Sequence, residues 1–389
     1  MSEKTDFADR MGSIQPFHVM DLLARARQLE AEGKDIVHME IGEPDFPTPD
    51  PVRRAALKGL ESDPVHYTPA LGLPELREAI SGFYQQRYGL DIPASRIVVT
   101  PGASGALLLV VNLLINPGDG VLMSDPGYPC NRNFVSLACG KSVMIPVNAD
   151  TRYQVTENLV RQHWNNSSRA VLLASPANPT GSLVDHEELK KIHTYVQHNQ
   201  GHLIVDEIYH GLVYSDHPES ALSIDDSVFV INSFSKYFGM TGWRLGWIVA
   251  PEWAVEGLDR LAQNLYLAAP TLAQHAALRA FSPENLEILE QRRQTFAHRR
   301  DFLVPALRSL GFELPFEPEG AFYVYANCEK FSNDSFALCN ALLSEAGVAV
   351  TPGLDFGDHL ASKHLRFAYT ADIGRLEEGI RRMQKFLAS

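Results

Sequence analysis

From residue 50 onward, the chain alternates between two kinds of apolar pattern. Short continuous apolar runs are typical of strands buried on both faces, and longer segments with apolar positions every three or four residues are typical of helices. The continuous runs predict strands at residues 96–100, 121–124, 143–146, 169–174, 202–209, 228–232 and 245–250. The periodic segments predict helices at residues 52–60, 75–88, 106–115, 156–163 and 185–197. This alternation predicts an α/β fold in which helices cover both faces of a mostly parallel sheet.

The pattern changes at the two ends of the chain. Residues 13–35 have the apolar spacing of a helix, and a short strand from residue 36 follows. After residue 252 the chain is mostly helical, and its last part mixes short strands with helices. Because 389 residues exceed what one hydrophobic core usually supports, we expect two domains. The expected division is a large domain of residues 46–285 and a smaller α+β domain formed by residues 1–45 with 286–389.

A lysine lies just after the strand expected at residues 228–232. Ser233, Ser235 and Lys236 come first, and Arg244 follows within the same stretch. Burial behind a strand lowers the pKa of a lysine and frees its amine to act as a nucleophile, while serine and arginine are donors that hold phosphate. The combination suggests pyridoxal phosphate held as a Schiff base. The alternative is an ordinary lysine on a solvated turn, and the short motif alone favours that alternative.

Polar side chains also follow other expected strands. Asn178 comes after the strand at residues 169–174, and Asp206 and Tyr209 end the strand at residues 202–209. The carboxyl ends of parallel strands meet at one edge of a sheet, where ligands bind. We therefore expect these three side chains to lie near Lys236.

A glycine-containing turn at residues 101–105 joins a strand to an apolar helix. The N–H groups at a helix N-terminus bind anions, so this turn is a candidate phosphate contact. It is neither a G-x-G-x-x-G motif nor a Walker loop, and nucleotide binding is not indicated. Turns of this kind are also common in α/β proteins without any ligand.

The composition and charge exclude several kinds of partner. The chain is 45% apolar and 21% charged, as in soluble globular proteins, and its formal net charge of −13 repels nucleic acid and anionic membranes. Its first ten residues are polar and unlike a signal peptide, and its cysteines form no C-x-x-C pair. The apolar neighbours of Cys139 and Cys339 suggest buried thiols. We expect a reduced cytoplasmic protein without a metal site.

Taken together, the motifs resemble those of the class I/II aminotransferases, which have fold type I of the pyridoxal-phosphate enzymes. The resemblance covers roughly residues 13–387, with the motifs in the order and at the spacing of that family. The matching segments are residues 233–244 (SFSKYFGMTGWR), 178–181 (NPTG), 206–209 (DEIY), Tyr67-Thr68 with Gly72, and 318–323 (PEGAFY).

The resemblance implies roles around the cofactor ring. Lys236 would carry pyridoxal 5'-phosphate and then move the proton between the substrate Cα and the cofactor. Asp206 would keep the pyridine nitrogen protonated, which maintains the ring as an electron sink. Tyr209 and Asn178 would donate hydrogen bonds to the phenolate oxygen, and Tyr128 would stack on the ring.

The resemblance also implies contacts to the phosphate and to the substrate. Ser233, Ser235, Arg244 and the backbone at Ala103 and Ser104 would surround the phosphate. Tyr67 would reach the phosphate of a neighbouring subunit, which implies a homodimer with shared active sites. Arg366 would bind the substrate α-carboxylate through its two-pronged guanidinium, with the Gly42 backbone nearby and Asn178 also within reach.

Two departures from the family pattern concern the substrate. One aspartate-specific branch has a lysine where this chain has Ser104. Residues 264–271, which would line the neighbouring active site, are more apolar than the Ser/Asn-rich version of that segment. Both departures favour an alanine-like or larger apolar amino acid as the donor.

The leading hypothesis is a ping-pong aminotransferase whose acceptor is 2-oxoglutarate or pyruvate. A pyridoxal-phosphate lyase or an aminocyclopropane-forming synthase would share Lys236, Asp206 and Arg366, so these alternatives stay open. A non-catalytic effector-binding module is an alternative of another class. It would require an N-terminal helix-turn-helix domain, and only about a dozen residues precede the first expected helix here.

Overall fold

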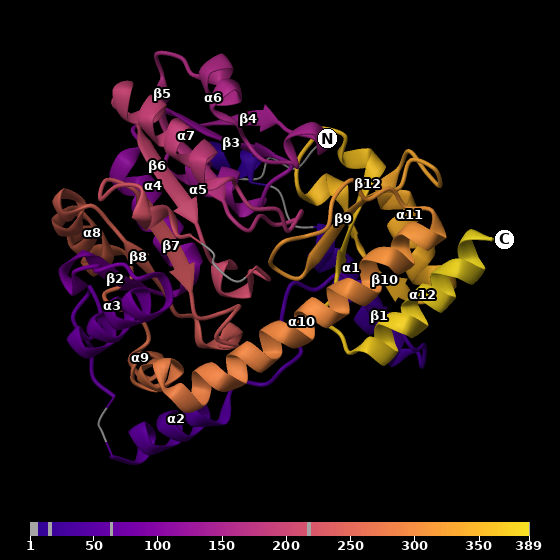
Figure 1. Cartoon of the computed structure of the whole chain (residues 1–389), viewed down its shortest axis with the longest axis horizontal. Coiled ribbons are helices and arrows are strands. Elements are labelled where there is room, and N and C mark those ends of the chain that lie inside the picture. Colours follow the sequence, from indigo (N-terminus) through magenta and orange to yellow (C-terminus); the bar gives the residue numbers. More distant parts are fainter. Residues whose placement is uncertain (1–6, 15–17, 63–64, 216–218, 389) are drawn as a thin grey trace.

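A seven-stranded sheet forms the centre of the larger part of the molecule (Figure 1). The computed structural model describes residues 7–14, 18–62, 65–215 and 219–388. The strands lie in the order β2-β8-β7-β6-β5-β3-β4, and only β8 runs antiparallel to its neighbours. A mostly parallel sheet is therefore confirmed. The strands are β2 (Ile97–Thr100), β3 (Gly120–Asp125), β4 (Lys141–Pro146), β5 (Ser168–Ala174), β6 (His202–Asp206), β7 (Phe229–Ser233) and β8 (Gly246–Val249).

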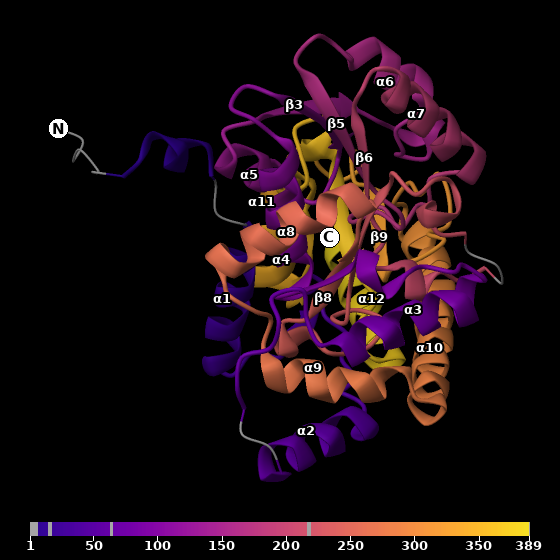
Figure 2. The same cartoon turned by 90° about the vertical axis from the view of Figure 1, so that its left-hand side faces the viewer.

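Helices cover both faces of this sheet, as the sequence predicts. Successive residues of a strand point to opposite faces, and along β2 Val98 packs into one apolar cluster while Ile97 and Val99 pack into the other. The Val98 cluster lies beneath α4 (Gly102–Leu114), α5 (Cys130–Leu137) and α8 (Glu252–Leu265). The opposite cluster lies beneath α3 (Pro74–Tyr88), α6 (Glu157–His163) and α7 (His186–His198). Figure 2 faces the side where α4 and α8 lie.

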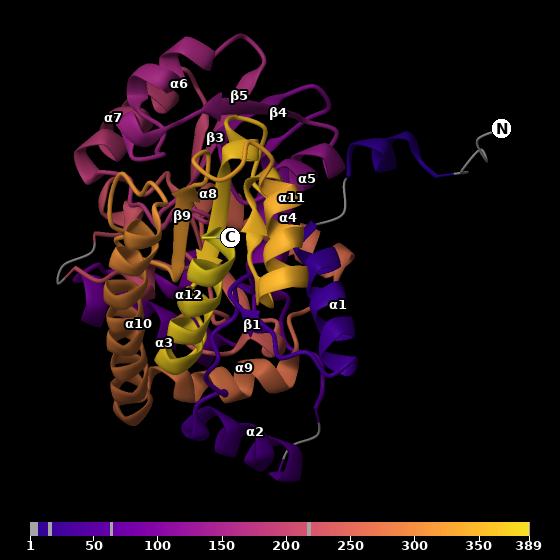
Figure 3. The same cartoon turned by 90° about the vertical axis from the view of Figure 1, so that its right-hand side faces the viewer.

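The smaller part of the molecule joins the two ends of the chain. A three-stranded antiparallel sheet in the order β11-β12-β9 forms its centre, and β1 pairs in parallel with β10 next to it. Figure 3 faces this part, with α10, α12 and α1 in view. Its strands are β1 (Val37–His38), β9 (Tyr323–Asn327), β10 (Val348–Ala349), β11 (Thr351–Pro352) and β12 (His364–Ala368). The remaining helices are α1 (His18–Ala31), α2 (Asp50–Ser62), α9 (Thr271–Ala277), α10 (Pro283–Leu310), α11 (Ser335–Ala341) and α12 (Ile373–Leu387).

Several expected element boundaries were wrong. The strand expected at residues 202–209 ends at Asp206, because the Ile208 N–H turns back to donate to the Asp206 side chain at 3.1 Å. The helix expected at residues 106–115 starts at Gly102. The helix expected at residues 13–35 is α1, preceded by a short 3-10 turn at Asp9–Ser13, and residues 15–17 lie outside the described part.

Two further expectations need correction. The sequence did not indicate α5, whose eight residues include only two that are buried. A helix with so short an apolar stripe leaves little periodic signal. Cys139 is exposed, because the chain turns there with a φ of 58° at the end of α5, whereas Cys339 is buried as expected. Within the described ranges, no helix is long and apolar enough to cross a membrane.

The helix α10 connects the two parts of the molecule over 28 residues (Figure 1). Near its middle, Arg299 is almost fully buried and donates to both carboxylate oxygens of Asp45 at 2.8 Å. It also donates to the Thr370 carbonyl oxygen at 2.6 Å. One guanidinium therefore ties α10 to the segment that follows β1 and to the segment that follows β12.

We expect Arg299→Met to lower the free energy of unfolding by roughly 2 kcal/mol or more, since it leaves a half-buried carboxylate and a carbonyl without their donor. Urea denaturation followed by circular dichroism measures this change. Arg381→Met is the control, because Arg381 pairs with Glu378 on an exposed helix face and its removal should change the midpoint little. Equal midpoints for the two variants would contradict the proposed tie.

Candidate active site

A cavity of about 520 Å³ opens at the carboxyl edge of the seven-stranded sheet and reaches the smaller part of the molecule. It brings together every site residue predicted from the sequence except Tyr67. Tyr67 is 84% exposed and does not line the cavity of its own chain. The predicted residues that line the cavity are Gly42, Ala103, Ser104, Tyr128, Asn178, Asp206, Tyr209, Ser233, Ser235, Lys236, Arg244 and Arg366.

Lys236 lies at the centre of this cavity. The strand β7 ends at Ser233, and the following turn directs the Lys236 Nζ to the Gly42 carbonyl oxygen, to which it donates at 2.6 Å. Burial, together with the cation of Arg366, lowers the pKa of Lys236 to about 8, and Glu43 acts in the opposite direction. A part of this amine is therefore neutral near physiological pH.

Asp206 faces the same cavity from the end of β6. Its carboxylate is 4% exposed and accepts a hydrogen bond from the Ile208 N–H. Burial raises the pKa of Asp206 to about 7, while the Ile208 hydrogen bond opposes that shift. A cationic ring nitrogen placed against this carboxylate would hold it in its charged form.

Arg366 and Asn178 form the opposite wall. The Arg366 Nη1 donates to Asn178 Oδ1 at 2.9 Å, and its Nη2 donates to the Glu40 carbonyl oxygen at 2.6 Å and to Thr351 Oγ1 at 3.2 Å. These bonds fix the plane of a buried guanidinium and use both N–H groups of Nη2. One N–H of Nη1 and the Nε–H, which has no partner among the described residues, remain for a substrate carboxylate. The Asn178 oxygen is engaged by Arg366, so its amide NH₂ is the group that can donate to a ligand.

The first turn of α4 forms an anion cradle at the other end of the cavity. Gly102 has a φ of 74°, and a Cβ there would lie 2.6 Å from Arg244 Nη2, so glycine lets the guanidinium approach the helix N-terminus. The free N–H groups of Ala103 and Ser104 begin this helix. The Ser233 hydroxyl donates to the Leu245 carbonyl oxygen and accepts from the Ser235 N–H, so it first holds the turn together.

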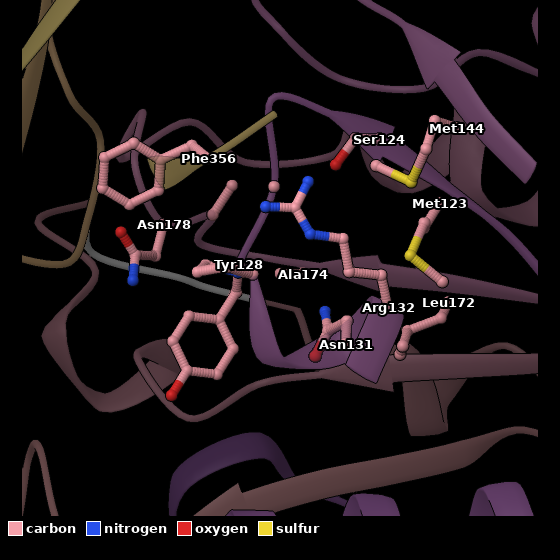
Figure 4. Close-up of a pocket in the computed structure, with 13 residues that line it drawn as sticks. Met123, Ser124, Tyr128, Asn131, Arg132, Met144, Leu172, Ala174, Asn178 and Phe356 are labelled. Atoms are coloured by element: carbon pink, nitrogen blue, oxygen red, sulfur yellow. The ribbon is translucent and has the colours of Figure 1, made fainter. Parts of the chain in front are cut away.

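Tyr128 separates the main cavity from a small one with space of about 10 Å³, enough for a single water (Figure 4). Figure 4 shows Tyr128 and Asn178 on one side of the small cavity and Asn131 and Arg132 on another. Arg132 Nη2 lies 3.4 Å from the Asp355 carbonyl oxygen, which links α5 to the smaller part of the molecule. The Cys130 Sγ lies 3.4 Å from the Tyr128 hydroxyl oxygen.

Several residues of the site were missed by the sequence analysis, Tyr323 first among them. Tyr323 lines the cavity from the start of β9, and its hydroxyl lies 2.8 Å from that of Tyr209. Its ring lies 4.3 Å beneath the Arg366 guanidinium. Tyr323 ends the 318–323 segment that contributed to the family resemblance, but no chemical role was assigned to it. Glu40 and Glu43 also line the cavity and were likewise missed.

Comparison with known proteins identifies the class. A family model for class I and II aminotransferases matches residues 34–383. A valine–pyruvate aminotransferase from Mycobacterium tuberculosis is 38% identical over 387 residues, which are 99% of this chain and 100% of that protein. A (5-formylfuran-3-yl)methyl phosphate transaminase from Methanocaldococcus jannaschii is 36% identical over 381 residues, 97% and 98% of the two chains. The crystal structure of an aminotransferase from Mycobacterium tuberculosis matches with a TM-score of 0.95 at 38% identity and covers 99% of each chain.

The chain therefore belongs to the class I and II aminotransferases, and it is a transaminase. Its fold is that of the structurally matched aminotransferases, as the resemblance predicted. Enzymes of this family use pyridoxal phosphate. The cavity fits that group, because it combines a buried lysine amine, a buried carboxylate and an anion cradle. Among the described residues, no three His, Cys, Asp or Glu side chains could together hold a metal ion.

The lowered pKa of Lys236 has a measurable consequence. Only a neutral amine adds to an aldehyde, so in cofactor-free protein the reaction of Lys236 should accelerate as pH rises through about 8 and level off above it. An unperturbed lysine would keep accelerating toward its ordinary pKa of about 10.4. Borohydride trapping of the imine, followed by peptide mass spectrometry, measures the rate at each pH.

Arg366→Met is the matched variant for this measurement. Removing a nearby cation should move the midpoint for Lys236 to higher pH, because Arg366 lowers its pKa. Arg381→Met on the exposed face of α12 should leave the midpoint unchanged. A wild-type midpoint above pH 10 would show that the amine is solvated rather than buried.

Proposed function

We propose that this transaminase uses pyridoxal 5'-phosphate to move an amino group from an L-amino acid to a 2-oxo acid by a ping-pong mechanism. The observation that carries the proposal is that Lys236, Asp206 and Arg366 line one cavity, with both charged groups close enough to act on the Lys236 amine. The bound cofactor supplies an electron sink for the substrate Cα. Everything else in the reaction is done by side chains of the enzyme.

Lys236 has two tasks. Its amine, which is about half neutral at pH 8, would hold the cofactor covalently until an amino acid displaced it. The freed amine would then carry the proton between the substrate Cα and the cofactor. Asp206 is the counter-charge for the protonated ring nitrogen, and Tyr209 and Asn178 donate to the ring oxygen.

The phosphate end needs groups from both sides of a dimer. The N–H groups of Ala103 and Ser104, the Arg244 guanidinium and the Ser235 hydroxyl form the part supplied by one chain. Tyr67 is exposed in the single chain, which suits a side chain that reaches the phosphate site of a partner subunit. We propose a cytoplasmic homodimer with shared active sites and the 46–285 domain division predicted from the sequence.

Arg366 orients the substrate. Its guanidinium, fixed by Asn178 and Glu40, binds the α-carboxylate, with the Gly42 backbone beside it. The 2-oxo acceptor has the same carboxylate next to its reacting carbon. Donor and acceptor can therefore use one site in turn, which is the structural requirement for a ping-pong reaction.

An apolar amino acid fits the remaining wall best. Val19, Met20 and Leu23 of α1 line the cavity, together with Ile41 and Leu107. Its described cations are Lys236, Arg244 and Arg366, all of which have other roles, and Glu43 adds negative charge. Among the described residues of this chain, a second carboxylate on the donor would find no further cation in the cavity. The name of the Mycobacterium tuberculosis relative, a valine–pyruvate aminotransferase, supports the same class of donor.

We expect an apolar donor such as valine or alanine to have a kcat/KM at least about tenfold higher than that of aspartate, since an unpaired carboxylate in this cavity costs more than 1.4 kcal/mol. Stopped-flow absorbance of the half-reaction, with one amino acid at a time, measures this ratio. Lys236→Ala should abolish the half-reaction. A faster reaction with aspartate would contradict the donor class.

The same measurement tests the reaction class. A transaminase converts its bound cofactor to the amino form in the absence of any oxo acid, and addition of 2-oxoglutarate or pyruvate then restores the starting spectrum. A lyase or a cyclopropane-forming synthase would consume the amino acid without accumulating the amino form. That outcome would overturn the proposal while leaving the cofactor site intact.

A further inference from the structure

Tyr323 has a hydroxyl that none of the roles above uses. The side chain is 1% exposed and lies at the first position of β9. Its ring supports Arg366, but its hydroxyl points elsewhere, to the hydroxyl of Tyr209 at 2.8 Å. The two residues are 114 positions apart in the chain, so the whole fold is needed to bring these oxygens together.

We propose that Tyr323 is a positioning residue that acts through Tyr209. Its hydroxyl donates to the Tyr209 oxygen and thereby directs the single Tyr209 proton to the ring oxygen of the bound cofactor. The inference rests on the proposed function, since it requires a cofactor held by Lys236. In this arrangement the Tyr323 hydroxyl lies behind the Tyr209 hydroxyl, which would contact the cofactor.

Hydrogen-bond counting supports this direction. Each tyrosine hydroxyl has one proton to donate, and in a buried pair one hydroxyl must donate to the other. When Tyr209 donates into the cavity, Tyr323 is the member of the pair that can still donate to the Tyr209 oxygen. In such a chain each bond polarises the next, so Tyr209 becomes a stronger donor than it would be alone.

Packing keeps the Tyr323 hydroxyl in place. A Cβ on Gly42 would overlap this hydroxyl, so only glycine leaves room for it at that position. On the ring side, Arg366 lies across the face, and Tyr323 pairs with Ala368 in the sheet two positions beyond Arg366. The hydroxyl therefore cannot turn away from Tyr209 without moving the strand.

The same arrangement connects Tyr323 to the lysine. The Gly42 carbonyl oxygen accepts the hydrogen bond from Lys236 Nζ at 2.6 Å, while the Gly42 Cα faces the Tyr323 hydroxyl. The Lys236 Nζ also lies 5.7 Å from the centre of the Tyr209 ring. The Tyr323 hydroxyl therefore contacts both Gly42 and Tyr209, the two groups that lie next to Lys236. Removing this hydroxyl should change the proton affinity of the lysine–cofactor link.

Tyr323→Phe separates the two functions of the side chain, because it keeps the ring under Arg366 and removes the hydroxyl. In the holoenzyme loaded with pyridoxal phosphate, we expect the apparent pKa of the lysine–cofactor link to rise by about half a unit, the effect of losing part of one hydrogen bond. Absorbance titration of the bound cofactor measures this pKa. We also expect kcat to fall about two- to fivefold and the KM for the amino donor to stay within about twofold.

Tyr325→Phe is the matched control. Tyr325 lies two positions along the same strand, is also buried, and its hydroxyl has no hydrogen-bond partner among the described residues. Loss of the Tyr325 hydroxyl should leave the apparent pKa of the lysine–cofactor link at the wild-type value. Gly42→Ala is the second variant, because it displaces the Tyr323 hydroxyl while both tyrosines remain, and it should shift the titration in the same direction as Tyr323→Phe.

The outcomes separate this inference from the proposed function. If the wild-type cofactor spectrum did not change with pH, or if Lys236→Ala kept the wild-type spectrum, the proposed function would fail. The role of the hydroxyl would be disproved if the wild type showed a pH-dependent cofactor spectrum and Tyr323→Phe had the same apparent pKa as the wild type and Tyr325→Phe. A raised KM with an unchanged pKa of the lysine–cofactor link would show that Tyr323 only supports Arg366. That result would also overturn the inference.

Discussion

The Lys236 amine is buried against a carbonyl oxygen, and no carboxylate of the described residues is hydrogen-bonded to it, which is the constraint on which the site depends. A carboxylate in hydrogen-bond contact would hold the amine in its charged form, whereas the Gly42 carbonyl orients it and leaves burial free to lower its pKa to about 8. Asp206 lies in the same cavity, but its carboxylate accepts from the Ile208 N–H. The two charges are thus kept near each other without being paired, which leaves the carboxylate for the cofactor nitrogen and the amine for the substrate.

This constraint explains why the site needs both parts of the molecule. The Gly42 carbonyl comes from the N-terminal segment, Lys236 from the seven-stranded sheet and Arg366 from the antiparallel sheet near the C-terminus. Two of the places along this seam show how little room is left for a side chain. At Gly42 the space is taken by the Tyr323 hydroxyl, and at Gly181 a Cβ would lie 2.9 Å from the Gly320 carbonyl oxygen. Close backbone approach is the means by which distant segments reach one cavity.

The sequence predicted the sheet and most of the cavity because both depend on local patterns. Continuous apolar runs mark buried strands, and polar residues just after them collect at one edge, so Asn178, Asp206 and Lys236 could be placed together. Tyr323 could not be given its role, because its contacts with Tyr209 and Gly42 depend on how two sheets meet. The contact of Tyr67 with a phosphate site stays a prediction. Its proposed partner is in another subunit, and nothing in a single chain supplies that contact.

Substrate choice depends on a different set of residues from the chemistry. In the proposed reaction, the lysine, the carboxylate and the guanidinium would fix the reacting atoms, whereas Val19, Met20 and Leu23 form a wall that belongs to α1. This helix is held at its start by Asp355, whose Oδ2 accepts from the Val19 N–H at 2.8 Å, and it packs against the smaller part of the molecule. The wall and Arg366 therefore both belong to the smaller part of the molecule, whereas Lys236 belongs to the larger one. Side chains on α1 can change in size without disturbing the proton-transfer geometry, and this independence allows one catalytic arrangement to serve donors of different shape.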